Sequence, residues 1–551
     1  MKIVIVGGVA GGMSTAARLR RLDEAAEIVV LERSGHVSFA NCGLPYHLSG
    51  TIADRDDLLL QTPEGLRARF DLDVRVRHEV TAIDREARTV TIVDLATGRE
   101  SVETWDHLVL SPGAAPFVPD VPGKERGHTL RNIEDLDGLV AALDGTPGGP
   151  VRSAVVVGAG FIGLEAAENL RERGLDVTVV ELADQVMAPL DAEMALRVAD
   201  ELTAHGVALE LGTSLSAVGE HAVTLADGRQ VDADLVLFAV GVRPDTTLAR
   251  GTGLAIGPRG GIAVDEQQRT SDPRIFALGD VAEKTDAVDG GAALVPLANL
   301  ANRHGRRVAD VIAGRPARSG VTQSTAIVKV FGLTAAMSGW SEKRARAAGV
   351  PVGVVHTHAA SHAGYYPGAQ AMALKVVYRE SDGRLLGVQA IGHEGVDKRV
   401  DVIATAMRAG MAVEALADLE LAYAPPFGSA KDPVNVVGYV AENRRSGLDD
   451  ALQWHEVAAA VGGGASVLDV RTSEEHEAGH LPGALHVPLD DLRSRLAALP
   501  AGDLVVYCGV GQRAHVAARL LRQHGRRVRN LDGGWQTWST SPAGRAVGVL
   551  V

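Results

Sequence analysis

The chain has 551 residues, of which 46% are hydrophobic and 23% charged, and its formal net charge is −14. This length predicts three or four domains. The excess of negative charge argues against binding to nucleic acid or to an anionic membrane surface. No apolar stretch approaches the ~20 residues that cross a bilayer, and the opening MKIVIVGG lacks the pattern of a signal peptide, so we expect a cytoplasmic protein.

The first predicted element is a buried strand at residues 2–6 that runs into a glycine turn and a helix at 13–22. Gly7 and Gly12 fit a dinucleotide-binding turn, although Val9 stands where the middle glycine belongs. Glu32 ends the following strand, where a carboxylate can accept hydrogen bonds from a ribose, and its neighbour Arg33 is a further candidate cofactor contact.

Cys42 and Cys508 are the two cysteines of the chain. Two cysteines cannot form a disulfide framework, and their spacing does not suggest zinc, so no metal site is predicted. A lone cysteine is more often an inert buried residue than a nucleophile, so each must be judged by its surroundings.

A second strand, turn and helix follow at 154–157, 158–163 and 164–173, after a Pro-Gly loop at 147–150. Its glycines fit G-x-G-x-x-G completely, with Gly158, Gly160 and Gly163 in the three positions. Glu181 ends the next strand and can bind a ribose diol. Because no arginine follows Glu181 closely, NADH is favoured over NADPH, which stays possible.

The stretch TSDPRIFALGD at 270–280 reads as a turn, a strand and Gly279-Asp280. With the two glycine turns in order, it resembles the flavoproteins of the pyridine nucleotide:disulfide oxidoreductase family over roughly residues 1–445. The resemblance implies FAD on the first unit, held in part by Gly113, Gly279 and Asp280, and NAD(P)H on the second.

The stretch SFANCG around Cys42 resembles the branch of coenzyme A disulfide reductases, NADH oxidases and NADH peroxidases. The positions where dithiol reductases carry a second cysteine hold residues 44–47, LPYH, so Cys42 must cycle through an external sulfur or a sulfenic acid. Peroxidases and many oxidases place a histidine where this chain has Ala10, which weakens the peroxide and oxygen alternatives.

The same resemblance implies a coenzyme A site. The residues that match its phosphate and pantetheine contacts are Ser14, Arg18, Arg21, Ser38 and Asn41. Arg18 and Arg21 share one helix face, which by default would be a solvated basic surface. A lysine of the family is replaced by Phe70 here, which puts part of this contact in doubt.

After about residue 325 a predicted antiparallel hairpin, 376–378 with 385–391, marks a change of architecture. In the family, the partner subunit brings two tyrosines and a lysine toward the cysteine. The matching residues are Tyr365, Tyr423 and Lys431, with Tyr366 a rival for Tyr365, so a homodimer with a shared active site is implied.

From about Trp454 the chain resembles a single rhodanese domain, through VLDVR, GHLPGA and LDGGW in order. Its active loop is Cys508-Gly509-Val510-Gly511-Gln512-Arg513, in which backbone N–H groups, Arg513 and a helix dipole can stabilise a thiolate or persulfide at Cys508. Some rhodanese-like modules lack the cysteine and only bind partners; its presence here favours catalysis.

The predicted fold class is α/β, with two Rossmann-like dinucleotide-binding domains, an α+β dimerisation domain and an α/β rhodanese domain. The expected boundaries are FAD-binding at 1–112 and 245–325, NAD(P)H-binding at 113–244, dimerisation at 326–446, a linker at 447–455 and rhodanese at 456–551.

The favoured function is FAD-dependent reduction of coenzyme A disulfide, coenzyme A persulfide or polysulfide, with coenzyme A as substrate or bound ligand. A water- or peroxide-forming NADH oxidase, and a redox sensor or sulfur-delivery protein, are the alternatives.

Overall fold

The computed structural model describes residues 1–145 and 150–548. Most of the loop predicted at 147–150, and the last three residues of the predicted rhodanese region, lie outside these ranges. The chain divides into two compact units, Met1–Asp184 with Gly206–Thr322 and Gln185–His205 with Gln323–Val551.

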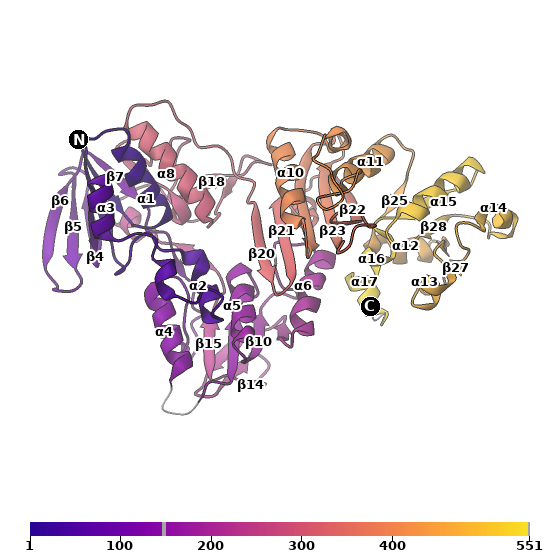
Figure 1. Cartoon of the computed structure of the whole chain (residues 1–551), viewed down its shortest axis with the longest axis horizontal. Coiled ribbons are helices and arrows are strands. Elements are labelled where there is room, and N and C mark those ends of the chain that lie inside the picture. Colours follow the sequence, from indigo (N-terminus) through magenta and orange to yellow (C-terminus); the bar gives the residue numbers. More distant parts are fainter. Residues whose placement is uncertain (146–149, 549–551) are drawn as a thin grey trace. The chain divides into compact units, whose positions relative to one another are not determined.

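The first unit contains a five-stranded parallel sheet in the order β17-β7-β1-β2-β3. Its strands are β1 Lys2–Val6, β2 Glu27–Glu32, β3 Asp73–Val76, β7 His107–Leu110 and β17 Ile275–Ala277. Helices α1 (Ala10–Arg20) and α8 (Ala298–Ile312) pack against each other beside it, as Figure 1 shows. The central strands are fully buried because side chains pack on both faces, which explains their unbroken apolar sequences.

Smaller elements surround this sheet. They are the antiparallel strands β4 His78–Asp84, β5 Thr89–Asp94 and β6 Glu100–Thr104, the pairs β8 Ala114–Pro116 with β16 Val242–Pro244 and β18 Lys284–Thr285 with β19 Ala292–Ala293, and the helices α2 Leu44–Leu48, α3 Pro63–Phe70 and α7 Thr247–Gly251.

A second parallel sheet in the same unit has the order β11-β10-β9-β15. Its strands are β9 Ser153–Val157, β10 Asp176–Glu181, β11 Ala208–Leu211 and β15 Leu235–Phe238, accompanied by the helices α4 Ile133–Asp144 and α5 Phe161–Glu172 and by a meander of β12 Leu215–Val218, β13 Ala222–Leu225 and β14 Gln230–Asp232. Both glycine turns thus join a central parallel strand to a helix, as predicted. Both helices begin three residues earlier than the apolar runs indicated.

The second unit contains an antiparallel sheet in the order β20-β21-β24-β23-β22. Its strands are β20 Ala326–Val330, β21 Leu333–Gly339, β22 Val352–Ala360, β23 Ala371–Arg379 and β24 Leu385–Gly392, and its helices are α6 Ala192–Ala204, α9 Glu342–Ala347, α10 Val396–Arg408 and α11 Pro433–Arg445. The hairpin β23–β24 is the predicted one, and α10 and α11 pack on the sheet (Figure 1).

The same unit ends in a parallel sheet in the order β25-β29-β28-β26-β27. Its strands are β25 Ala451–Leu452, β26 Ser466–Asp469, β27 Leu485–His486, β28 Leu504–Tyr507 and β29 Val528–Leu531, and its helices are α12 Val457–Gly462, α13 Ser473–Glu477, α14 Leu492–Arg495, α15 Gln512–Gln523, α16 Gly534–Trp538 and α17 Pro542–Ala546. Strand β25 lies within the segment predicted as a linker, so those residues are part of this sheet.

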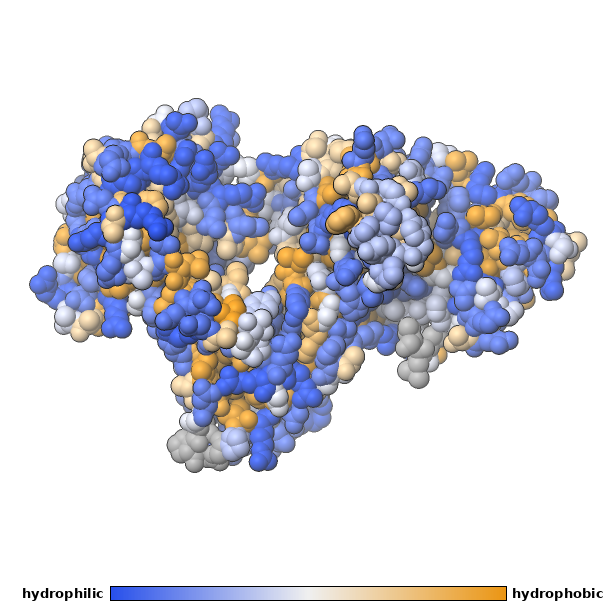
Figure 2. Space-filling model, in the orientation of Figure 1, coloured by the Kyte–Doolittle hydropathy of each residue, from blue (hydrophilic) through white to orange (hydrophobic). Residues whose placement is uncertain are grey.

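The visible surface is largely hydrophilic, with apolar residues in separate patches (Figure 2). Within the described ranges, we find no helix with both the length and the apolar character that a membrane crossing requires.

Candidate functional site

Cys42 lies in a short 3-10 helix, Asn41–Gly43, directly before α2. The backbone N–H of Ser38 donates to the Gly8 carbonyl at 2.9 Å, which ties this segment to the first glycine turn. Ser38 has φ of 49°, a left-handed conformation that costs a non-glycine residue free energy and is often found at functional sites. The Cys42 Sγ lies 3.8 Å from Asn41 Oδ1.

A cavity of about 660 Å³ opens beside Cys42 in the first unit, within the size range of ligand sites. It brings together Cys42 and all five residues that the sequence predicted for coenzyme A on this unit: Ser14, Arg18, Arg21, Ser38 and Asn41. Ala10 also lines it, so the position that holds a histidine in the oxidase and peroxidase relatives faces the same space.

The cavity is strongly basic in an acidic protein. Four arginines line it, Arg18, Arg21, Arg69 and Arg306, and none of its described lining residues is an aspartate or glutamate. Arg18 already forms an ion pair, because its Nη2 lies 2.8 Å from Asp310 Oδ1. The arrangement suits a ligand with several negative charges.

Phe70 and its neighbour Arg69 both line the cavity. Phe70 stands where the resemblance implies a lysine in the family, but Arg69 supplies a cation one residue earlier. Asn302 and Arg306, on α8, also reach the cavity, and Ser14 Oγ donates to Asn302 Oδ1 at 2.7 Å.

Two carboxylates shape the electrostatics at Cys42. Partial removal from water raises the pKa of the Cys42 thiol, and the negative charges of Glu165 and Asp280 raise it further. Burial also raises the pKa of Glu165, to about 7, against the opposing effect of a hydrogen bond from Tyr46. The Tyr46 hydroxyl lies 3.3 Å from Glu165 Oε1. Neither Glu165 nor Tyr46 was predicted as a site residue.

The first glycine turn leads into a helix start whose polarity suits the pyrophosphate of FAD. Helix α1 begins after Val9 with neither a side-chain cap nor an acidic residue in its first turn, so its N-terminal N–H groups and positive dipole end are left for an anion. The Gly7 backbone has φ of +100°, and a Cβ there would lie 2.1 Å from the Ser111 carbonyl oxygen, so only glycine fits. At Gly12 a Cβ would collide with the turn itself.

Glu32 ends β2 and accepts hydrogen bonds from the N–H groups of Gly8 and Ser34 at 2.7 and 2.8 Å. Burial raises the pKa of its carboxyl, while nearby Arg131 favours the ionised form. Arg33, the other candidate there, lies at the surface with its Nη1 3.4 Å from Glu79.

Asp280 lies in a short 3-10 helix, Gly279–Val281, that is separated from the end of β17 by one residue. Burial raises its pKa, and Lys284 and Arg131 oppose that shift by favouring the carboxylate. Lys284 donates to the Gly279 carbonyl, and both Gly279 and Gly113 have positive φ, as glycine allows. Arg131 is a half-buried cation that was not predicted as a site residue. These residues fit FAD.

The second glycine turn fits a nicotinamide dinucleotide. A Cβ at Gly160 would meet no atom within 4 Å, so the space over the turn is open for a pyrophosphate, whereas Gly158 and Gly163 are packed too tightly for any side chain. Helix α5 likewise starts without a side-chain cap or an acidic first turn. The Glu181 carboxylate accepts from the Ala159 and Ala183 N–H groups at 2.7 and 2.9 Å, at the edge where a ribose would lie.

In the second unit, Tyr365 and Tyr423 come together, with their hydroxyl oxygens 3.0 Å apart. Tyr366 instead packs its ring edge-on against His362. This geometry distinguishes the two rival tyrosines and favours Tyr365. Lys431 is exposed, and the roles of these residues toward a partner subunit stay predictions.

Cys508 directly follows β28 and is fully buried at the start of the second candidate site. The Gly511 N–H points at its Sγ from 3.2 Å, and α15 begins at Gln512 without an acidic first turn. A hydrogen bond from the Trp535 N–H to the Cys508 carbonyl, at 2.8 Å, fixes the backbone of the loop. One amide of the loop therefore faces the sulfur, and the stabilisation of a thiolate or persulfide by several loop N–H groups stays a prediction.

The guanidinium of Arg513 is bound to a carboxylate. Its guanidinium forms two hydrogen bonds with the carboxylate of Glu475, at 2.7 and 2.6 Å. These bonds are the main cause that raises the pKa of Arg513, and Cys508 adds a smaller effect. Glu475, on α13, was not predicted.

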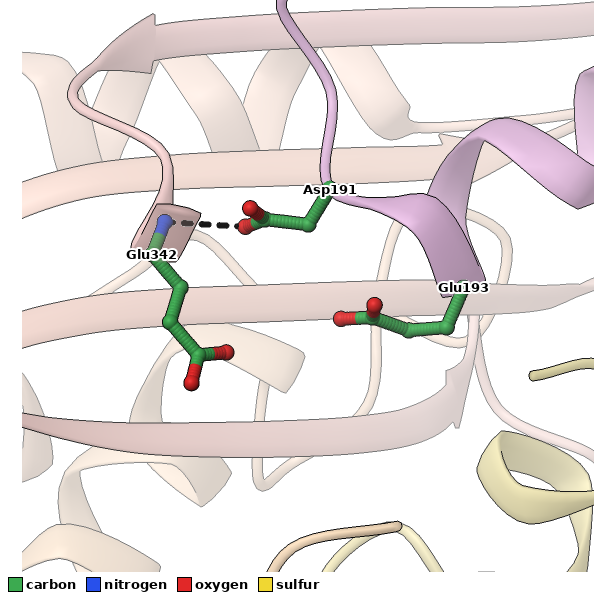
Figure 3. A group of neighbouring side chains, drawn as sticks. All are labelled: Asp191, Glu193 and Glu342. Atoms are coloured by element: carbon green, nitrogen blue, oxygen red, sulfur yellow. Dashed lines mark hydrogen bonds between the residues drawn. The ribbon is translucent and has the colours of Figure 1, made fainter. Parts of the chain in front are cut away.

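Three buried carboxylates gather in the second unit and could in principle hold a metal ion (Figure 3). They are Asp191, Glu193 and Glu342, and the Glu342 N–H donates to Asp191 at 2.9 Å. The Lys375 ammonium lies among them, 3.0 Å from Asp191 and 2.7 Å from Glu342, and also binds Glu193. Because the Lys375 ammonium already binds all three carboxylates, the cluster gives no support for a metal site.

The cluster continues into the rhodanese sheet. His356, on β22, lies 3.1 Å from Glu193 on one side and 2.8 Å from Asp532 on the other. Asp532 also accepts from Arg444 and Gln453. These contacts form a buried ionic chain that connects the two sheets of the second unit. Asp532 belongs to the LDGGW stretch, in which Trp535 donates a hydrogen bond to the Cys508 carbonyl.

Comparison with known proteins agrees with this architecture. The family described as Pyridine nucleotide-disulphide oxidoreductase matches residues 1–305, its dimerisation domain matches 325–433, and the Rhodanese-like domain matches 453–541. With two dinucleotide-type sheets, a glycine turn on each and a cysteine in the first unit, the fold and site define a flavin- and nicotinamide-binding oxidoreductase.

The chain belongs to the pyridine nucleotide-disulphide oxidoreductase family and carries a rhodanese-like domain. It is 36% identical to a coenzyme A disulfide reductase of Staphylococcus haemolyticus over 80% of this chain and 99% of that protein. The structure of reduced Bacillus anthracis CoADR-RHD is 47% identical, with a TM-score of 0.96 over 98% of both chains. An NAD-dependent persulfide reductase from A. fulgidus is 36% identical, with a TM-score of 0.91 over 98% of this chain and all of that one. The predicted family and fold class are confirmed.

Proposed function

We propose that this protein uses NADH to reduce coenzyme A disulfide or coenzyme A persulfide through Cys42, and that Cys508 carries sulfane sulfur. The observation that carries the proposal is the basic cavity that has Cys42 in its wall. The names of the relatives support it, since they include a coenzyme A disulfide reductase and a persulfide reductase.

The lining of the cavity suits the parts of coenzyme A. Its arginines suit the phosphates, and apolar lining such as Met13, Phe39 and Leu60 suits the pantetheine arm. Asn41 and Ser38 offer polar contacts near the thiol end, next to Cys42. A small disulfide without phosphates would leave the four arginines unused.

Cys42 supplies the nucleophile. Its thiolate attacks one sulfur of a coenzyme A disulfide, which forms a Cys42–coenzyme A disulfide and releases the other coenzyme A as a thiolate. With coenzyme A persulfide, the same attack on the inner sulfur releases hydrosulfide. Bound FAD, reduced by NADH, would supply the electron pair that cleaves the mixed disulfide and restores the thiolate. Tyr365 and Tyr423 are the candidates to donate a proton to the departing sulfur from a second subunit.

The glycine turn and the amide-lined loop suit Cys508 to a different task. The thiolate can accept a sulfane sulfur atom, and the loop N–H groups can stabilise the resulting terminal anion. This reaction needs no electrons, so it can proceed apart from the flavin. We propose that it feeds sulfur to the reductase.

The test separates the two half-reactions of Cys42→Ser by anaerobic stopped-flow spectroscopy of the FAD-loaded chain. Reduction of the flavin by NADH should persist, because it precedes the cysteine, whereas turnover with coenzyme A disulfide should fall at least about a thousandfold. Cys508→Ser is the matched control and should keep coenzyme A disulfide turnover.

Near-normal disulfide turnover by Cys42→Ser would overturn the proposal. If the wild type oxidised NADH in air as fast as with any sulfur acceptor, the oxidase alternative would replace it. Feeble turnover with every acceptor would instead support a sensor or sulfur-delivery protein. A catalytic efficiency that favoured NADPH would contradict the assignment of Glu181.

A further inference from the structure

Arg513 is the one charged side chain in the sequence Cys508-Gly509-Val510-Gly511-Gln512-Arg513. An unpaired arginine at this position would attract anionic sulfur donors. Here Glu475 binds it with both carboxylate oxygens, at 2.7 and 2.6 Å. Both side chains remain more than a third exposed, so the pair lies at the open rim of the loop and not in the core.

Glu475 is held in place. It forms a capping box at the start of α13, because its N–H donates to Thr472 Oγ1 at 3.3 Å and its carboxylate accepts from the Thr472 N–H at 3.0 Å. The hydrogen bonds with Arg513 lower the pKa of Glu475 to about 2, so it is ionised at neutral pH.

The ion pair lies against the segment that carries the sulfur. A Cβ placed on Gly509 would be 3.5 Å from Arg513 Nη2 and 3.6 Å from Glu475 Oε1. Because Cys508 itself is fully buried, a donor must approach from the rim to deliver sulfur. The carboxylate therefore stands within a few ångströms of any donor at that point.

Two further basic side chains of the domain also lie against carboxylates. Arg471, which acts on Glu475 electrostatically, is paired with Asp469 at 2.7 Å, and His515 on α15 lies 3.2 Å from Asp449. A donor thus meets amide dipoles but little net positive charge.

We propose that Glu475 is a specificity-determining residue of the rhodanese loop: by neutralising Arg513, it disfavours dianionic sulfur donors such as thiosulfate and favours donors with one negative charge or none. This inference rests on the proposed function of Cys508.

The reaction itself is the same for both classes of donor. The Cys508 thiolate attacks the outer sulfur of thiosulfate, a sulfur–sulfur bond forms to Cys508, and sulfite leaves with the bonding electrons. With methanethiosulfonate, which has the same sulfane sulfur but one negative charge fewer, methanesulfinate leaves instead. The two donors therefore differ chiefly in charge.

The experiment measures the rate of persulfide formation at Cys508 by intact-mass spectrometry, with each donor in turn. The full chain carries Cys42→Ser, which leaves Cys508 as the sole cysteine. The test variant is Glu475→Gln, which retains the capping-box hydrogen bond. The control is Glu474→Gln, which removes the same charge from an exposed neighbour on α13.

Electrostatic free energy scales with the donor's charge, so the gain for a dianion should be about the square of the gain for a monoanion. We expect Glu475→Gln to raise kcat/KM about tenfold for thiosulfate and about threefold for methanethiosulfonate, and Glu474→Gln to change the ratio between the donors much less.

Equal gains for both donors, or the same change of ratio in the control, would overturn the role of Glu475 while leaving Cys508 active. If no donor loaded Cys508 in the parent chain, the proposed function of the rhodanese domain would fail together with the inference. Circular dichroism of both glutamine variants checks that a lost signal does not come from unfolding.

Discussion

Cys42 reacts as a thiolate, and the two carboxylates nearest to it oppose that charge. Glu165 is ionised above its raised pKa of about 7, which is below the raised pKa of the thiol, so the carboxylate is charged throughout the range in which Cys42 titrates. Its removal should therefore lower the pKa of the thiol.

The expected fall in the pKa of the thiol can be tested with Glu165→Gln, in a chain that also carries Cys508→Ser so that Cys42 is its sole cysteine. The pH dependence of Cys42 alkylation by iodoacetamide should move to lower pH, because the thiolate no longer faces the Glu165 charge. Glu172→Gln, at the exposed end of the same helix α5, is the control and should leave the profile in place. A shift to higher pH in Glu165→Gln would contradict the electrostatic assignment.

Residue-scale prediction from sequence worked where a motif carried the information. Cys42 and the five residues predicted to contact coenzyme A on the first unit line one cavity, although the contact itself stays a prediction. Arg69 and Arg306 were missed because surface arginines are common, and nothing in the sequence shows that α8 packs beside α1. Glu475 was missed for the same reason, since it is separated from Arg513 by 38 positions.

At the scale of elements, β22 and the turn after β29 share a buried ionic chain through His356 and Asp532. Asp532 and the hydrogen bonds around it raise the pKa of His356, although burial opposes that shift. Protonated His356 thus stabilises the fold below the ordinary histidine pKa, and this contribution is lost as the pH rises through the raised value.

We expect His356→Ala to destabilise the contact between the two sheets by about 3 kcal/mol, because it leaves buried charges uncompensated. Hydrogen exchange of the segment 528–538 should quicken in the variant. In the wild type, protection of that segment should fall as the pH rises through the raised pKa of His356, after correction for intrinsic exchange, and His356→Ala should lose this dependence.

His358 provides the matched control two residues along β22. Burial lowers its pKa well below the ordinary value, so it stabilises the fold in its neutral form and contributes nothing to a loss at high pH. His358→Ala should keep the pH dependence of the wild type. An unchanged pH dependence in His356→Ala would show that the ionic chain does not hold the two sheets.

The elements themselves were largely predictable, because each glycine turn follows an unbroken apolar strand. The segment predicted as a linker, 447–455, differs from the structure. Its polar residues indicated a free connection, yet Asp449 binds His515 and Ala451–Leu452 pair with β29. Two-residue strands leave no periodic signal, so such pairing could not be foreseen. The domain boundaries stay predictions.

At the scale of the whole molecule, the second unit exposes aromatic side chains that water disfavours. Phe427 is 71% exposed and Tyr365 77%, within the region that matches the family's dimerisation domain. We expect a second copy of the chain to cover this surface. Phe427→Asp should therefore shift the protein toward monomers in sedimentation velocity, because a buried charge in the interface would be unpaired.

Val516→Asp on α15 is the control for that experiment, since Val516 is also exposed but lies in the rhodanese domain. It should leave the oligomeric state unchanged. A wild type that sedimented as a monomer at all concentrations would contradict both the dimer and the shared active site.

The central claim, that Cys42 exchanges sulfur with coenzyme A, can be tested by intact-mass spectrometry under denaturing, non-reducing conditions. After incubation with coenzyme A disulfide and without NADH, the chain should gain the mass of one coenzyme A at Cys42. The adduct should disappear when NADH is added to the FAD-loaded protein and should not form in Cys42→Ser. Wild-type protein that acquired no coenzyme A under these conditions, or an adduct that persisted in Cys42→Ser, would contradict the account.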